Sequence, residues 1–109
     1  MKISEVPFFT TDWETVPEQT YKGERGEAVW KVIQAGDIRV RKVRYSPGYK
    51  ADHWCTKGHI LLVIEGILNT ELQDGRTFSL KQGTSYQVAD NSEPHRSSTE
   101  TGATLFIVD

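Results

Sequence analysis

The chain has 109 residues, enough for one domain with a single core and too few for a second core. Its 13 Lys and Arg and 15 Asp and Glu give a formal net charge of −2 at pH 7, so no broad cationic surface is available to a nucleic acid. The single cysteine excludes an intramolecular disulfide, the first 13 residues do not resemble a signal peptide, and the longest apolar run, residues 60–64, is far shorter than a membrane span. We therefore predict a cytoplasmic protein that binds neither nucleic acid nor membrane.

Residues 1–26 are polar with scattered aromatic side chains, and they show neither strand alternation nor a sustained helical period. We interpret them as an N-terminal arm that packs on the body of the protein. Residues 27–109 are then predicted to form the single domain.

A hairpin is predicted from residues 28–34 and 38–45, two runs with alternating apolar side chains separated by Ala35-Gly36-Asp37. In the second run the two-residue period slips once, which predicts a β-bulge near Arg41 and Lys42. We interpret the basic residues of this run as a solvated strand face, with the orientation of an acidic ligand as the alternative; they are Arg39, Arg41, Lys42 and Arg44.

A second hairpin is predicted from residues 67–73 and 76–80, because Asp74-Gly75 between them suits a two-residue type I′ turn. Further short apolar runs bring the expected number of strands to about eight; they are residues 60–64, 86–89 and 105–108. Eight short antiparallel strands are typical of a β-sandwich or a small barrel.

The stretch ADHWCTKGHI, residues 51–60, holds two of the three histidines and the only cysteine. In an extended strand His53 and Cys55 are two positions apart and point to the same face. Residues 56–58 predict a tight turn, after which His59 opens a strand that folds back on the first. His95 follows another turn, at residues 91–94, and opens a further strand. All four potential metal ligands are thus expected at the ends of strands.

This spacing resembles the cupin superfamily, whose first motif is G(X)5HXH(X)3-4E(X)6G and whose second is G(X)5PXG(X)2H(X)3N. His53, Cys55, His59 and Gly66 fit the first motif, with Cys55 in the place of its second histidine and His59 in the place of its glutamate. Residues 83–95 resemble the second motif, and Asp52-His53-Trp54-Cys55 is similar to the signature of the small DHCW-motif cupins. Four features depart from the motifs: the positions of Gly48 and Gly83, the sequence of residues 89–91, and Thr99 in the place of asparagine.

The resemblance implies an all-β fold, a small cupin barrel (double-stranded β-helix or jelly roll) with an N-terminal arm. It also implies one divalent transition metal ion per chain, held by His53, Cys55, His59 and His95, and pairing of two barrels into a homodimer. A thiolate in the place of the carboxylate keeps the ligand charge at −1 and favours zinc, with iron or nickel as alternatives.

Three functions fit such a site: a metalloenzyme acting on a small organic molecule, a non-catalytic binder of a small ligand, and a barrel stabilised by a structural metal. The sequence assigns no catalytic residue and no reaction. Cys55 has two alternative roles, as a buried core residue or as a nucleophile. Trp54 is expected to pack between sheets or at a subunit contact, and Tyr49 or Tyr86 to line a cavity at the barrel mouth.

Overall fold

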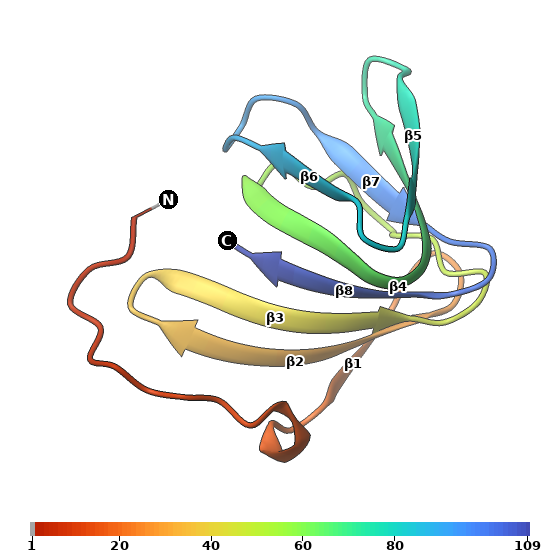
Figure 1. Ribbon diagram of the computed structural model, residues 1–109. Coiled ribbons are helices and arrows are strands. Elements are labelled where there is room, and N and C mark those ends of the chain that lie inside the picture. The colour runs from red at the N-terminus through yellow and green to blue at the C-terminus, as the bar shows by residue number, and fades with distance from the viewer. Residues whose placement is uncertain (1) are drawn as a thin grey trace.

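The computed structural model describes residues 2–109, which form eight β-strands and one short 3₁₀ turn, η1 (Trp13–Thr15), without an α-helix (Figure 1). The predicted all-β class is therefore confirmed for this part of the chain. No helix in residues 2–109 has the length and apolar character that a membrane span requires. The strands are β1 (Gln19–Lys22), β2 (Glu27–Ala35), β3 (Ile38–Tyr45), β4 (His59–Leu72), β5 (Thr77–Lys81), β6 (Ser85–Val88), β7 (His95–Ser98) and β8 (Ala103–Val108).

The strands pair in antiparallel fashion and form two sheets that share β4 (Figure 1). The larger sheet has the order β1-β2-β3-β8-β4-β6, and the smaller sheet has the order β5-β4-β7. The first half of β4 pairs with β6 and β8, and its second half pairs with β5 and β7. One long strand therefore replaces the two separate runs expected at residues 60–64 and 67–73.

A register shift between Val63 and Glu65 accompanies the passage of β4 from one sheet to the other. Before the shift, the buried side chains alternate from His59, and after it they resume at Leu68. The inserted residue thus keeps the apolar face of both halves turned toward the same core. The buried apolar residues of that core are Ala28, Val43, Tyr49, Leu61, Val63, Leu68, Leu80, Ala103, Leu105 and Ile107.

The bulge predicted near Arg41 and Lys42 is wrong, because β3 pairs with β2 and β8 in unbroken register. The apolar residues of this strand lie on both of its faces. Val43 is buried in the core, whereas Val40 lies on the opposite face, beside Val108 of β8. The period appeared to slip because the outer face of the larger sheet is itself apolar.

The hairpin of β4 and β5 is confirmed, but its turn is not the predicted type I′ turn. Of Asp74 and Gly75, only Gly75 has a positive φ, 100°, whereas a type I′ turn needs a positive φ at both central residues. The Asp74 carboxylate instead accepts a hydrogen bond of 3.1 Å from the backbone N–H of Arg76. This local bond holds Asp74 in the ordinary backbone region.

Part of the expected arm packs against the larger sheet. The ring of Trp13 meets that of Phe106 edge to face, with 6.1 Å between centroids, and Lys31 Nζ donates a hydrogen bond of 2.8 Å to the Trp13 carbonyl. Residues 19–22 form β1 and extend the sheet by pairing with β2. The division of the chain at residue 26 stays a prediction.

Two glycines allow the bend of β4 to be tested. Gly66 has φ 82°, and a Cβ atom there would lie 2.2 Å from the carbonyl oxygen of Gly102. Gly83 has φ 86°, and a Cβ atom there would meet nothing within 4 Å among the described residues. We expect Gly83→Ala to lower the free energy of unfolding by about 1–2 kcal/mol through backbone strain alone. Gly66→Ala should cost about 1–3 kcal/mol more because of the clash.

Urea denaturation of both variants measures this difference. Equal losses at the two positions would show that the contact between β4 and the turn before β8 does not constrain the fold.

Candidate metal centre

Three of the four predicted ligands converge at one point between the sheets. The sulfur of Cys55 and one ring nitrogen each of His59 and His95 lie within 4.8 Å of one another. His59 opens β4 and His95 opens β7, and both side chains are buried. A two-way backbone bridge places Cys55 beside His95, since the N–H of each bonds to the carbonyl of the other, at 2.8 and 3.0 Å.

His53 lies outside this cluster. Its side chain is 76% exposed, and its Nδ1 is 2.6 Å from the Asp52 carboxylate. The expectation that His53 and Cys55 share a face assumed an extended strand, whereas the chain bends at residues 52 and 53. The bend turns His53 to the surface and leaves Cys55 facing inward.

The ring of His95 has its hydrogen fixed by a backbone carbonyl. Its Nδ1 is 3.0 Å from the Glu93 carbonyl oxygen, which can only accept, so Nδ1 carries a hydrogen, and in the neutral ring Nε2 presents a lone pair. This Nε2 lies 3.1 Å from Nε2 of His59. Burial lowers the pKa of His95, but hydrogen bonds to Cys55 and Glu93 outweigh it, so the pKa is raised above its ordinary value.

The ring of His59 faces one acceptor and one donor. Its Nδ1 is 3.6 Å from the carboxylate of Asp109, and its Nε2 is 2.8 Å from the Tyr86 hydroxyl, which can donate a hydrogen bond to it. Burial raises the pKa of Tyr86, so its hydroxyl keeps the hydrogen that it donates. Burial also lowers the pKa of His59, which favours a neutral ring.

Cys55 adds an anion to these two lone pairs. The interaction with the neighbouring His95 ring lowers the pKa of the Cys55 thiol, although burial opposes this shift. Two imidazole nitrogens and a sulfur whose pKa is lowered therefore converge at one place. Acceptors that converge in this way are stabilised by a shared cation, either a proton or a metal ion. The donor set, one soft sulfur and two imidazoles, fits zinc or a neighbouring transition metal.

The solvated-face interpretation of the basic residues on β3 is wrong for Arg39 and Arg41. Both turn toward the buried carboxylate of Asp109, and Arg41 is only 6% exposed. Burial raises the pKa of Asp109, but its contacts with His59 and Arg39 and the charge of Arg41 hold it well below the usual range. Lys42 and Arg44 of the same strand are exposed, as expected.

Sequence reasoning missed Asp109. The signal was the alternation of buried residues along β8, which continues from Ala103 through Leu105 and Ile107 to Asp109. A carboxylate in phase with a core face needs a buried partner, and the arginines of the adjacent strand supply it.

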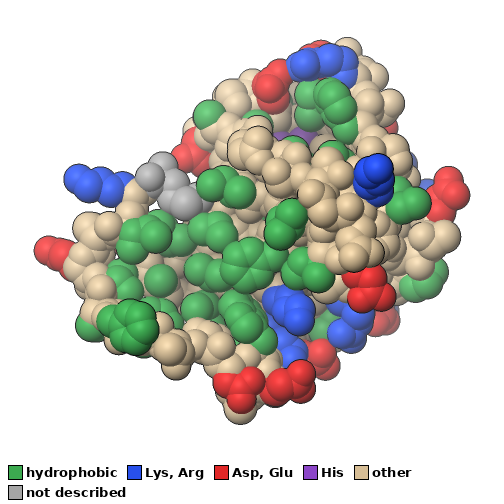
Figure 2. All heavy atoms as spheres, in the orientation of Figure 1, with side chains coloured by type: hydrophobic (Ala, Val, Ile, Leu, Met, Phe, Trp, Pro, Cys, Tyr) green, Lys and Arg blue, Asp and Glu red, His purple; other side chains and the backbone are tan. Residues whose placement is uncertain are grey.

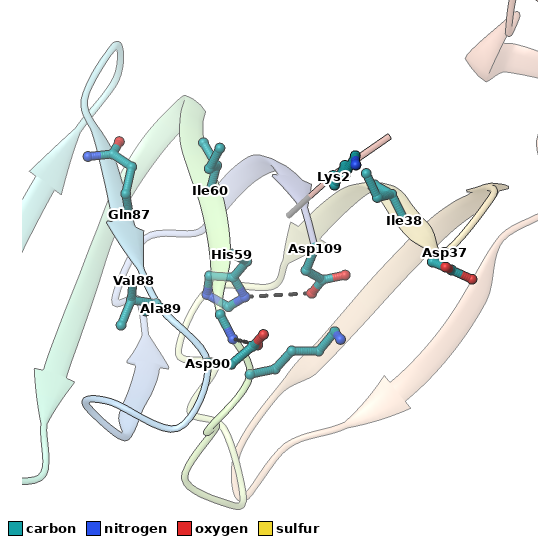
Figure 3. A pocket seen from close by; sticks show the side chains of 12 residues that line it. Lys2, Asp37, Ile38, His59, Ile60, Gln87, Val88, Ala89, Asp90 and Asp109 are labelled. Carbon is teal, nitrogen blue, oxygen red and sulfur yellow. Dashed lines mark hydrogen bonds and ion pairs between the residues drawn. The ribbon is translucent and has the colours of Figure 1, made fainter. Parts of the chain in front are cut away.

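The cluster separates two hollows. His59 and Asp109 line a surface recess of about 680 Å³ (Figure 3). On the other side, His95 and Tyr86 line a cavity of about 340 Å³ whose walls include the apolar side chains of Leu72, Phe78 and Leu80. A ligand in this cavity would lie directly beside the convergent lone pairs.

The aromatic residues near the site have distinct positions. Tyr86 lines the cavity, as expected, whereas Tyr49 stacks on Tyr45 within the core, with 4.1 Å between ring centroids. The guanidinium of Arg96 lies over the ring of Trp54, with 4.6 Å between the guanidinium carbon and the ring centroid. Trp54 therefore holds the segment before β4 against β7 and does not enter the cavity.

Comparison with known proteins gives structural likenesses only. No family model matches the sequence, and no curated protein matches it. An RmlC-like cupin from Shewanella frigidimarina has TM-score 0.72 and 18% identity, over 94% of this chain and 90% of that one. Ectoine synthase from P. lautus has TM-score 0.75 and 14% identity, over 93% and 76%.

A third solved structure, Fe(II)-HppE with the alternative substrate (S)-1-HPP, has TM-score 0.77 and 14% identity. The likeness covers 94% of this chain and 60% of that one, so the present chain spans less than two thirds of that protein. At these identities the likenesses establish the fold and nothing finer. The chain has the fold of the cupin superfamily.

Proposed function

We propose that this protein binds one divalent transition metal ion through Cys55, His59 and His95 and uses it to act on a small organic molecule. The observation that carries the proposal is the convergence of two imidazole nitrogens, 3.1 Å apart, with the Cys55 sulfur. Zinc is the first expectation because it accepts sulfur and imidazole together, and iron or nickel are the alternatives. A ligating thiol needs a reducing environment, so we place the protein in the cytoplasm.

When bound, such an ion polarises a carbonyl group or activates water. The chain itself supplies the surroundings. The apolar walls of the cavity exclude water from a bound molecule. The Tyr86 hydroxyl lines the cavity and would be free to donate a hydrogen bond to that molecule once His59 Nε2 binds the ion. Two structural neighbours, ectoine synthase and Fe(II)-HppE with its alternative substrate, have names that refer to small molecules. This supports a small organic molecule as the ligand.

Two alternatives share this site: a non-catalytic receptor for a small ligand, and a metal that only stabilises the barrel. The cavity beside His95 favours the first of these over the second, because a structural metal needs no adjoining space.

The narrower likeness to the DHCW-motif cupins rests on Asp52, His53, Trp54 and Cys55 alone.

The metal is tested by elemental analysis of zinc-loaded protein. We expect about one ion per chain in the wild type and a large loss in His59→Ala and in His95→Ala, because each removes a lone pair from the cluster. His53→Ala is the matched control, since His53 has an exposed side chain and should leave the content unchanged.

Full zinc content in folded His95→Ala would contradict the three-residue site. Loss of zinc from folded His53→Ala would instead favour the four-ligand set that the sequence predicts.

An accessible coordination position separates a working site from a structural one. We expect azide to change the visible spectrum of the cobalt-substituted protein, because the cavity leads to the cluster from the side of His95 and Tyr86. An unchanged spectrum at saturating azide, with thiolate-to-cobalt absorption present, would mean that the site is closed and structural.

We also propose that two copies pair through the outer face of the larger sheet. Figure 2 shows apolar side chains gathered over this face, and Ile60, Leu62 and Ile64 of β4 are 37–47% exposed on it. Strand register places Leu62 beside Phe106 and Ile60 beside Val108, so the apolar surface is continuous. The neighbouring surface carries acidic and basic side chains together, which suits a self-complementary contact; they are Glu14, Glu18, Lys31, Lys42, Arg44 and Glu65.

Light scattering tests this pairing. We expect a dimer for the wild type and a monomer for Leu62→Arg, since a charge at the centre of the apolar face would be buried without a partner. Ile67→Arg is the control, because Ile67 is comparably exposed but lies in the part of β4 that pairs with β5. A wild-type monomer at high micromolar concentration, or a Leu62→Arg dimer, would overturn the proposal.

A further inference from the structure

The carboxylate of Asp109 lies directly behind His59, with its side chain fully buried (Figure 3). Its backbone continues the pairing of β8 with β3: the Asp109 N–H bonds to the Arg39 carbonyl at 2.9 Å, and the Arg39 N–H bonds to the Asp109 carbonyl at 2.6 Å. The strand ladder therefore fixes where this side chain enters the interior.

Two arginines fix the orientation of the carboxylate. Arg39 binds it with two nitrogens, Nε to Oδ1 at 2.9 Å and Nη2 to Oδ2 at 3.0 Å, and Arg41 Nη2 reaches Oδ2 at 2.8 Å. Arg41 is itself held against Trp30, with its guanidinium carbon 4.4 Å from the ring centroid. With both oxygens engaged by guanidinium groups, the carboxylate is not free to turn toward the cluster as a metal ligand.

The same Oδ2 lies 3.6 Å from Nδ1 of His59. This nitrogen is buried and has no hydrogen-bond partner among the described residues. The separation exceeds a hydrogen bond, yet the carboxylate is the charged group that faces this nitrogen, and it can only accept. A hydrogen on Nδ1 is attracted to the carboxylate, whereas a lone pair there would be repelled by it.

The position of that hydrogen decides what His59 presents to the cluster. A neutral imidazole has one hydrogen, so a hydrogen on Nδ1 leaves Nε2 as a lone pair facing His95 and Tyr86. A hydrogen on Nε2 would block this lone pair.

We propose that Asp109 is a positioning residue that keeps the hydrogen of His59 on Nδ1 and so reserves Nε2 for a metal ion. Carboxylates behind metal-binding histidines commonly act in this way and raise the basicity of the ligand. The part of the inference that concerns the ion rests on the proposed function, whereas the position of the hydrogen does not.

Nitrogen NMR of the metal-free wild-type protein tests the position of the hydrogen without any substitution. Nitrogen-15 shifts and two-bond couplings of the His59 ring distinguish the two tautomers. We expect Nδ1 to carry the hydrogen, and an Nε2 hydrogen in the wild type would overturn the proposal.

The effect on the ion is tested by zinc titration against a competing chelator. We expect Asp109→Asn to weaken zinc binding by about 10- to 100-fold, the usual effect of removing such a partner. Asp37→Asn is the matched control: it is the same substitution in the same recess, Asp37 is exposed, and we expect no change in affinity.

A folded Asp109→Asn that binds zinc as tightly as the wild type would overturn the proposal. If Asp109→Asn does not fold because Arg39 and Arg41 lose their partner, the His59 tautomer measured in the wild-type protein still tests the proposal. If the wild type binds no metal, the proposed function fails, and the NMR measurement tests the role of Asp109 by itself.

Discussion

The constraint on which the rest of the structure depends is that β4 has to belong to both sheets. A straight strand of 14 residues would be about 45 Å long and would hold its two ends far apart. His59 stands at its first residue, while His95 pairs with Leu72 at its last. The Nε2 atoms of the two rings nevertheless lie 3.1 Å apart, because β4 bends back on itself after its register shift (Figure 1). The bend that closes the core therefore also assembles the site.

Much of this could be predicted from the sequence. The residue types and the motif spacing predict the chemistry of the three positions that converge, and the strand start at His95 follows from the turn residues before it. The tight turn expected at residues 56–58 is wrong, because no turn forms there and Cys55 pairs with His95 instead of with β4. His53 could not be placed in this way, because the shared face of two residues depends on an extended backbone that bends at residues 52 and 53. The basic residues of β3 were misread because a surface strand and a strand with buried arginines have the same composition. Only the buried carboxylate of Asp109, 70 residues away in sequence from Arg39, distinguishes them.

The electrostatics of the site follow from groups that can only accept hydrogen bonds. The Glu93 carbonyl holds a hydrogen on the outer nitrogen of His95, and we propose the same role for the Asp109 carboxylate behind His59. In the neutral rings the inner nitrogens then face each other as lone pairs. Cys55 adds a sulfur whose pKa is lowered by His95. Such an arrangement is costly without a cation and favourable with one, which is why we prefer a metal centre to a buried core cysteine or a lone nucleophile.

The measurement that tests this account most directly is X-ray absorption at the zinc edge of the loaded protein. The account predicts one sulfur neighbour and the multiple-scattering pattern of at least two imidazoles, from Cys55, His59 and His95. A coordination shell of oxygen alone, or one without sulfur, would contradict it.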